Sequence, residues 1–307
     1  MSFADLPDDI IYDIVSLLDF PTLQQPKKPA IQPDFAVFEK LHLISGPWNE
    51  LLLARKYRDI GKSTYEEVTV DFHSGELRLF PNLDNHSAQH YCAVSFHDDI
   101  SRIQKIQAKV IAVHGDDCAG CSHKWPVDLK LLAGLFQNCE DLNVKNLTSK
   151  NRLEGEFLSH LIQPFHCIKL FNVKGHAKTL KKFLPQAFKS RQLFYVVLDQ
   201  CSAYKGLQDD VLSFIKSLPA SERQKQIIIT RTQTFSFDFY ESLMDWRQKD
   251  GAGQEVNVDF GINKAASKKM LELVQDVRRY HYVPHEKSKR RASVFMENCR
   301  NLSVKFE

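Results

Sequence analysis

Apolar residues recur in two alternating patterns from about residue 125 to the C-terminus. Stretches with apolar residues three or four positions apart are typical of helices that bury one face. Each such stretch is followed by a short apolar run, which is typical of a strand. We expect helices around 129–136, 157–165, 180–188, 211–218, 239–244 and 271–277. We expect strands at 142–144, 170–173, 195–199, 227–230, 256–260 and 302–306.

The expected strands recur at a nearly constant distance along the chain. With Asn143, Phe171, Val197, Ile228 and Asn257 as markers, the separations are 28, 26, 31 and 29 residues. A period in this range predicts a stacked array of βα units. Parallel strands follow from this arrangement, because a helix connects each strand to the next.

Two segments of this region are similar to each other. Residues 138–145 (NCEDLNVK) and 298–305 (NCRNLSVK) are identical at five of eight positions. This pattern resembles a degenerate leucine-rich repeat, whose strand carries Leu-x-Val near an Asn or Cys. The resemblance implies an α/β solenoid with a parallel sheet over residues 116–307. A plain open α/β sheet would also alternate helix and strand, so that alternative stays open.

A different pattern precedes the array. Residues 64–79 contain two alternating apolar runs on either side of His-Ser-Gly, which predicts a β-hairpin. A further apolar run at 109–115 indicates another strand. We expect residues 53–115 to form a linker that joins the N-terminus to the array and shields the edge of its first strand.

The N-terminal sequence LPDDIIYDIVSLLDFPTL predicts an amphipathic helix. Leu6, Ile10, Ile14 and Leu18 recur at helical spacing and define one apolar face. Pro7 fits the first helical position, where a missing N–H costs nothing. A helical module of this size cannot bury much core alone, so its apolar face must cover a partner.

This stretch resembles the F-box, a motif with Leu-Pro, two acidic or polar residues and then aliphatic residues at these spacings. The later sequence FAVFEKLHLISGPWNELL matches its second and third helices. The resemblance covers residues 1–52, with an inserted loop at about 24–34 that contains three prolines. It implies docking onto a Skp-type adaptor and, through it, onto a cullin scaffold. The adaptor contacts that it implies are Leu6, Pro7, Ile10, Ile14, Leu18 and Trp48.

Motifs that carry chemistry are few. Cys118 and Cys121 have the spacing of a zinc pair, and His123 follows, but the chain has no second such pair. We therefore expect no bound metal and no cofactor. The chain also lacks phosphate-binding glycine loops, a nucleophile elbow and a zinc-protease motif, so we expect that it is not an enzyme.

Composition narrows the compartment and the partners. A formal net charge of +3 over 307 residues is too small to indicate, on its own, a surface that binds nucleic acid. No apolar run is long enough to span a membrane. Seven scattered cysteines favour a reducing compartment, hence the cytoplasm or the nucleus. The basic cluster at 287–291 fits a nuclear signal, a patch for an acidic partner or a solvated loop.

The F-box resemblance, followed by a repeat array, implies the substrate-recognition subunit of a Skp-type adaptor, cullin and F-box ubiquitin ligase. The alternative is a protein-interaction module that binds the adaptor without a role in ubiquitylation. Alternate residues of the expected strands point away from the core and offer a surface for a protein substrate. Apolar residues continue through 195–199 and 227–230, which indicates an apolar centre. The substrate-binding residues that we expect are Asn143, Tyr195, Val197, Asp199 and Asn257.

Overall fold

Part of the chain lies outside the described structure. The expected adaptor contacts Leu6, Pro7, Ile10, Ile14, Leu18 and Trp48 lie outside it, as do the loop at 24–34, Cys118, Cys121, His123 and residues 287–290 of the basic cluster. The computed structural model describes residues 64–81, 91–96, 103, 105–115, 127–217, 225–249, 256–274, 281–284, 291–297 and 301–306.

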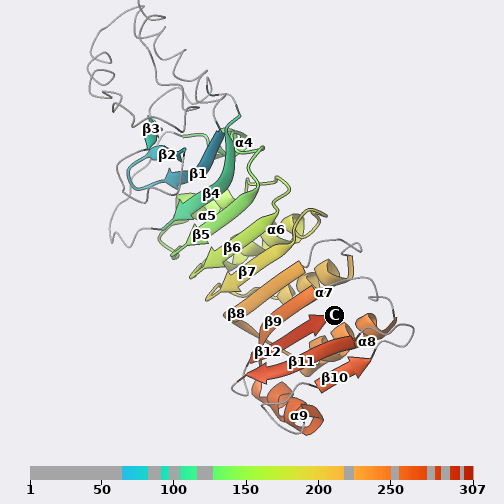
Figure 1. Ribbon diagram of the computed structural model, residues 1–307. Helices are drawn as coiled ribbons and strands as arrows, with labels where there is room; N and C mark the ends of the chain where they lie inside the picture. The colour runs from blue at the N-terminus through green and yellow to red at the C-terminus, as the bar shows by residue number, and fades with distance from the viewer. Residues whose placement is uncertain are drawn as a thin grey trace, which may run out of the picture.

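Twelve strands of the described residues form one continuous sheet (Figure 1). Its order is β10-β11-β12-β9-β8-β7-β6-β5-β4-β1-β2-β3. From β4 to β9, each strand pairs in parallel with the next one along the chain. The strands are β1 Thr64–Asp71, β2 Glu76–Phe80, β3 Cys92–Ser95, β4 Gln107–His114, β5 Asp141–Lys145, β6 Cys167–Phe171, β7 Tyr195–Asp199, β8 Lys225–Phe235, β9 Val256–Ile262, β10 His281–Pro284, β11 Arg291–Glu297 and β12 Asn301–Phe306.

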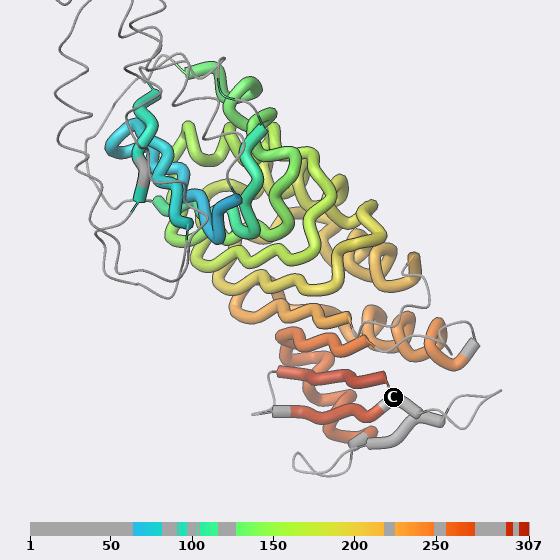
Figure 2. Tube along the Cα trace, turned by 45° about the horizontal axis from the view of Figure 1, so that its top comes forward, coloured from blue at the N-terminus to red at the C-terminus, as the bar shows by residue number. Residues whose placement is uncertain are grey.

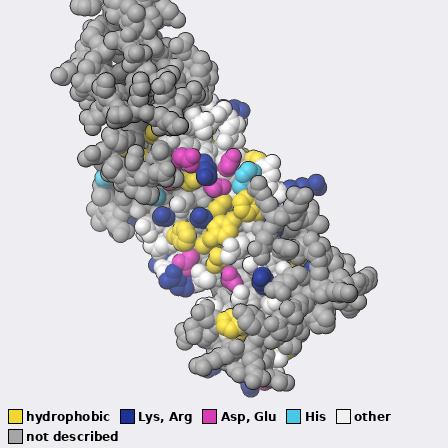
Figure 3. All heavy atoms as spheres, viewed as in Figure 1, with side chains coloured by type: hydrophobic (Ala, Val, Ile, Leu, Met, Phe, Trp, Pro, Cys, Tyr) yellow, Lys and Arg dark blue, Asp and Glu magenta, His cyan; other side chains and the backbone are white. Residues whose placement is uncertain are grey.

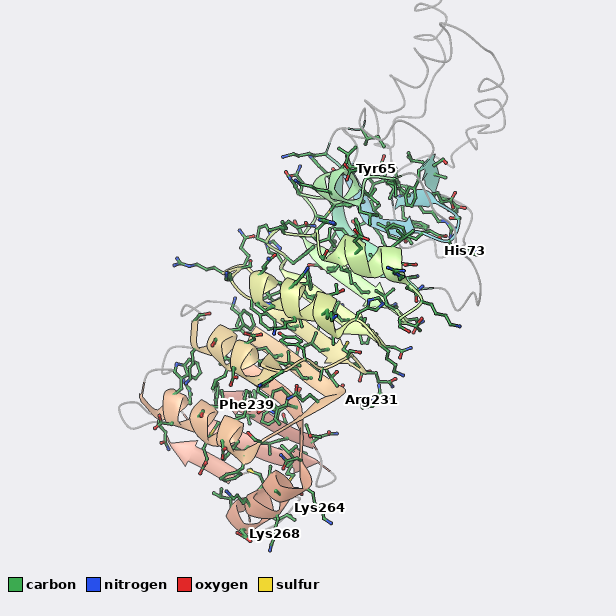
Figure 4. All side chains as sticks on the ribbon, turned by 180° about the vertical axis from the view of Figure 1, so that it is seen from behind. Tyr65, His73, Arg231, Phe239, Lys264 and Lys268 are labelled. Atoms are coloured by element: carbon green, nitrogen blue, oxygen red, sulfur yellow. The ribbon has the colours of Figure 1, made fainter. Side chains whose placement is uncertain are left out.

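Six helices in the described part of the chain lie on one face of this sheet (Figures 2 and 4). Connections between parallel strands are right-handed, so consecutive strands placed side by side in one direction bring every helix to the same face. The other face carries no helix of the described residues. The helices are α4 Leu129–Gly134, α5 Arg152–Leu158, α6 Ala177–Ala187, α7 Leu207–Ser217, α8 Phe237–Lys249 and α9 Lys264–Val274.

The expected α/β class and the expected alternation of helix and strand are confirmed. The wholly parallel sheet is wrong, because β12 pairs antiparallel with β9 and β11 pairs antiparallel with β12. For β11 and β12 the physical reason is the length of the connection, because only three residues separate the two strands and a helix does not fit between them. The similar segments 138–145 and 298–305 therefore contain strands of different kinds: β5 in the first is parallel to its neighbours, and β12 in the second is antiparallel to its neighbours.

The second expected helix is also shorter than its apolar spacing indicates. This helix, α5, ends at Leu158. Leu161 and Phe165 belong to the loop that follows, and their side chains are buried in the core. The side chain of Gln163 donates to the backbone oxygen of Phe136 at 3.1 Å and fixes this loop against the neighbouring unit. Pro164 comes next and, without an amide hydrogen, does not favour a continued helix.

The same left-handed residue recurs on four consecutive strands. The residue after each of β5, β6 and β7, and Arg231 within β8, has a positive φ between 50° and 59°. Backbone N–H groups at three of these turns donate to the neighbouring strand: Asn146 to Phe171 at 2.9 Å, Asn172 to Asp199 at 2.8 Å and Gln200 to Thr230 at 3.1 Å. Asn tolerates this left-handed conformation better than most residues. The turns therefore stack in register along the sheet.

The core lies between the sheet and the helix layer. Phenylalanine rings repeat along it, and Phe157 of α5 contacts both Phe136 and Phe72, with centroids 6.0 and 5.6 Å apart. Phe72 follows β1, and Val68 and Val70 of that strand are also fully buried. Burial of such side chains contributes roughly 1.5–3 kcal/mol each. The core is thus continuous from the hairpin into the array.

The expected hairpin is β1 and β2. The Asp71 carboxylate accepts from the backbone N–H groups of His73 and Ser74, and Gly75 adopts a φ of 70° that suits glycine. β1 pairs in parallel with β4 and covers its edge. No helix among the described residues is long and apolar enough to cross a membrane.

Candidate functional site

The face of the sheet opposite the helices is the candidate site, and we call it the open face. Strand residues alternate, so Leu142 and Val144 of β5 enter the core while the residues between and beside them point the other way. The register aligns the outward residues of neighbouring strands in rows. Across the five central strands the open face consists of Asp141, Asn143, Lys145, Cys167, Lys169, Phe171, Tyr195, Val197, Asp199, Gln226, Ile228, Thr230, Asn257 and Asp259.

The centre of the open face is apolar. Val197 and Ile228 are register partners on β7 and β8, and Tyr195 and Phe171 lie beside them. Val197 is only 5% exposed although it lies outside the main core cluster. Figure 3, drawn from the side of Figure 1, shows hydrophobic side chains gathered on this face with charged side chains around them. Such a centre with a polar rim is typical of a protein-binding surface.

Two lysines flank the apolar centre on the β5–β6 side. The Nζ atom of Lys169 lies 5.4 Å from the centre of the Tyr195 ring, within range of a cation–π interaction. Neither Lys169 nor Lys145 makes an ion pair within 4 Å in the described part of the chain. Burial, with a further contribution from Glu140, raises the pKa of the nearby Asp141 carboxyl. This side of the open face therefore offers positive charge next to apolar surface.

Asp199 is held in a fixed arrangement at the other side of the centre. The Arg231 guanidinium donates to Asp199 with two nitrogens, Nε to Oδ1 at 2.9 Å and Nη2 to Oδ2. The Thr230 hydroxyl donates to the same Oδ1 at 2.8 Å. The hydrogen bond from Arg231 holds the pKa of Asp199 below its ordinary value, against the opposite effect of burial. The Asp199 side chain is 15% exposed, whereas that of Arg231 is 65% exposed.

Removal of the arginine should release this carboxyl. In Arg231→Ala we expect the pKa of Asp199 to rise toward its ordinary value, as followed by carboxyl NMR across a pH titration. A lowered folded pKa stabilises the fold above the unfolded value of about 3.9, and this contribution is lost as the pH falls through the folded pKa. The variant lacks part of this contribution, so its free energy of unfolding should fall less steeply than that of the wild type as the pH is lowered through the acid range. Lys305→Ala on β12 is the control, and an equal shift there would contradict the assignment.

Nucleophilic chemistry finds little support on this face. Burial raises the pKa of the Cys167 thiol to about 11, so it is protonated at neutral pH. In the part of the chain that the structure describes, no three His, Cys, Asp or Glu side chains are grouped to hold a metal ion.

The structure brings all five expected substrate residues onto one face. Tyr195, Val197 and Asp199 lie on β7, with Asn143 two strands away on one side and Asn257 two strands away on the other. The amide oxygens of both asparagines are covered and accept no hydrogen bond from the described residues. Their role in binding a substrate stays a prediction.

The sequence patterns do not single out Lys169, which lies on the open face, or Arg231, which binds Asp199 there. The five strand markers do not share a row: Asn143 is in register with Lys169 rather than Phe171, and Ile228 is in register with Asp259 rather than Asn257. Alignment of the segments NVKN, KLFN and VLDQ by their final turn residue would have given the correct register.

Comparisons of the chain with protein-family models, with curated proteins and with solved structures found no match.

Proposed function

We propose that this chain is the substrate-recognition subunit of a Skp-type adaptor, cullin and F-box ubiquitin ligase. In this proposal residues 1–52 bind the adaptor and the open face captures a protein substrate. The observation that carries the second part is the open face itself, with an apolar centre of Phe171, Tyr195, Val197 and Ile228 inside a charged rim. The first part rests on the F-box resemblance of the N-terminal sequence.

We further propose that the array is a degenerate leucine-rich-repeat-like solenoid. Support comes from the parallel pairing of each strand from β4 to β9 with the next in chain order, and from helices on one side only among the described residues. The recurring left-handed residues Asn146, Asn172, Gln200 and Arg231 give further support. A plain open sheet does not require a repeated turn, whereas stacked repeats do. We propose the cytoplasm or the nucleus as the compartment.

Adaptor binding has a direct test. In Ile14→Asp we expect the full chain to lose the Skp-type adaptor in pull-down assays, because an unpaired carboxylate would be buried at the interface at a cost of several kcal/mol. Ile162→Asp is the matched control, since Ile162 is 73% exposed on the array. Adaptor recovery by Ile14→Asp at the wild-type level would exclude this docking mode.

The same experiment separates the proposed function from its alternative. Co-purification of a cullin together with the adaptor supports the ubiquitin-ligase role. Recovery of the adaptor without a cullin supports an interaction module that has no role in ubiquitylation.

A further inference from the structure

Basic side chains run along the solvent side of α6, on the face of the sheet opposite the open face. Residues 157–198 contain seven Lys or Arg and no Asp or Glu. Five of the seven lie on α6 and the loop after it, all exposed and without an ion pair or hydrogen bond to another described side chain. We call them the α6 strip: Lys178, Lys181, Lys182, Lys189 and Arg191.

Their spacing places the helical members together. Lys181 and Lys182 are three and four residues from Lys178, so the three side chains are neighbours on one side of the helix. Like charges at this spacing destabilise a helix. No acidic residue of α6 offsets this repulsion. An acidic partner would relieve it.

A groove adjoins the α6 strip on its α7 side. It has a volume of about 470 Å³, and the stacked rings of Phe188 and Phe214, 4.8 Å apart, form its floor. Lys189 and Arg191 line the groove together with Asp210 and Ser213 of α7, and the Asp210 carboxylate accepts a hydrogen bond from the Tyr204 hydroxyl at 2.8 Å. A cavity of this size accommodates a large apolar side chain. Positive charge and an apolar floor thus occur side by side.

Acidic residues limit the strip to the width of one helix. Glu156 on α5 and Asp209 on α7 are both exposed. Packed helices lie roughly 8–10 Å apart, so a nucleic-acid duplex across the strip would bring its phosphates close to these carboxylates. A peptide segment is narrow enough to follow α6 alone. The charge pattern therefore favours a protein partner over nucleic acid.

We propose that the α6 strip and its groove bind an acidic segment of a partner protein that carries an apolar side chain. Asp and Glu carboxylates face the lysines, and the apolar side chain enters the groove over Phe188 and Phe214. This site is independent of the proposed substrate face, which lies on the other side of the sheet. Both sites can be occupied at once.

The test uses the full chain and a labelled peptide probe. The probe has about twelve residues, Glu and Asp with one central Phe, and fluorescence anisotropy measures its binding. We expect the double variant Lys182→Glu with Lys189→Glu to weaken binding about tenfold or more, because two attractive contacts become repulsive. The matched control reverses Lys264 and Lys268 on α9, which Figure 4 shows away from α6, and should bind as the wild type does.

A second arm tests the groove. Replacement of the central Phe of the probe by Ser should weaken binding to the wild type, and Ser213→Trp, which fills the groove, should remove that difference. Equal binding of the two probes to the wild type would overturn the groove assignment. An equal loss of probe binding in the α9 control variant would overturn the assignment of the α6 strip as the binding site. If a single-stranded oligouridine binds more tightly than the peptide probe, and the α6 variant loses this binding, the partner of the strip is nucleic acid and not an acidic protein segment.

Discussion

The triple variant Asn143→Lys, Tyr195→Ala and Asn257→Lys should lose substrate capture while it keeps its fold and its adaptor. Removal of the Tyr195 ring takes away apolar contact area and the partner of the Lys169 ammonium. The two new lysines place long charged side chains on either side of the apolar centre. Loss of a central aromatic anchor alone commonly costs 2 kcal/mol or more at an interface, roughly a thirtyfold loss of affinity.

The fold should tolerate these changes. The amide oxygens of Asn143 and Asn257 accept no hydrogen bond from the described residues, so their replacement removes no bond that those oxygens make. Affinity purification with quantitative mass spectrometry measures the substrate, and recovery of the adaptor reports on residues 1–52. Gln137→Lys with Asn138→Lys adds the same charge at exposed positions between α4 and β5 and should keep the substrate. If substrate still co-purifies with the triple variant, the open face is not the receptor surface.

Much of this face could be predicted because strand alternation is a local property. Leu142 and Val144 are apolar and their neighbours are polar, so the sequence alone orients β5. In β7 and β8 the alternation disappears, and the expected apolar centre follows from that departure. Val197 and Ile228 occupy it. These features depend on one strand at a time.

The rest depends on contacts between distant segments. The clamp of Arg231 on Asp199 joins two residues 32 positions apart, and nothing in either local pattern indicates it. The antiparallel placement of β12 is equally non-local, because its residues repeat the pattern of a parallel strand. The early end of α5 also depends on a bond from Gln163 to a neighbouring unit. Periodicity identifies elements, but register and direction come from pairing.

The boundaries between parts of the chain also depend on contacts between distant segments. The expected division near residue 115 follows a change of pattern, yet β4 pairs with β5 in the same sheet and β1 pairs with β4. Phe72, after the first strand, contacts Phe157 in the second helix of the array. Hairpin and array therefore share one core, which leads to a prediction about stability.

Phe157→Ala should be strongly destabilising. Phe157 is fully buried, and its ring contacts those of Phe72 and Phe136. Deletion of a buried phenyl ring removes transfer free energy and leaves a cavity, at a typical cost of about 3–5 kcal/mol in the free energy of unfolding. Urea denaturation of the full chain, followed by circular dichroism, measures this loss. Ile162→Ala, at a position 73% exposed, should change the free energy of unfolding by no more than about 0.5 kcal/mol.

The location of the effect distinguishes a shared core from two separate ones. Because Phe157 contacts a residue beside β1, its removal should speed hydrogen exchange at amides of β1 as well as β5. Neither strand contains the substituted residue, so faster exchange in both reports a loss that spreads through the core. If only the amides of β5 and α5 lose protection while β1 exchanges as in the wild type, the hairpin has an independent core, and residue 115 is a true boundary.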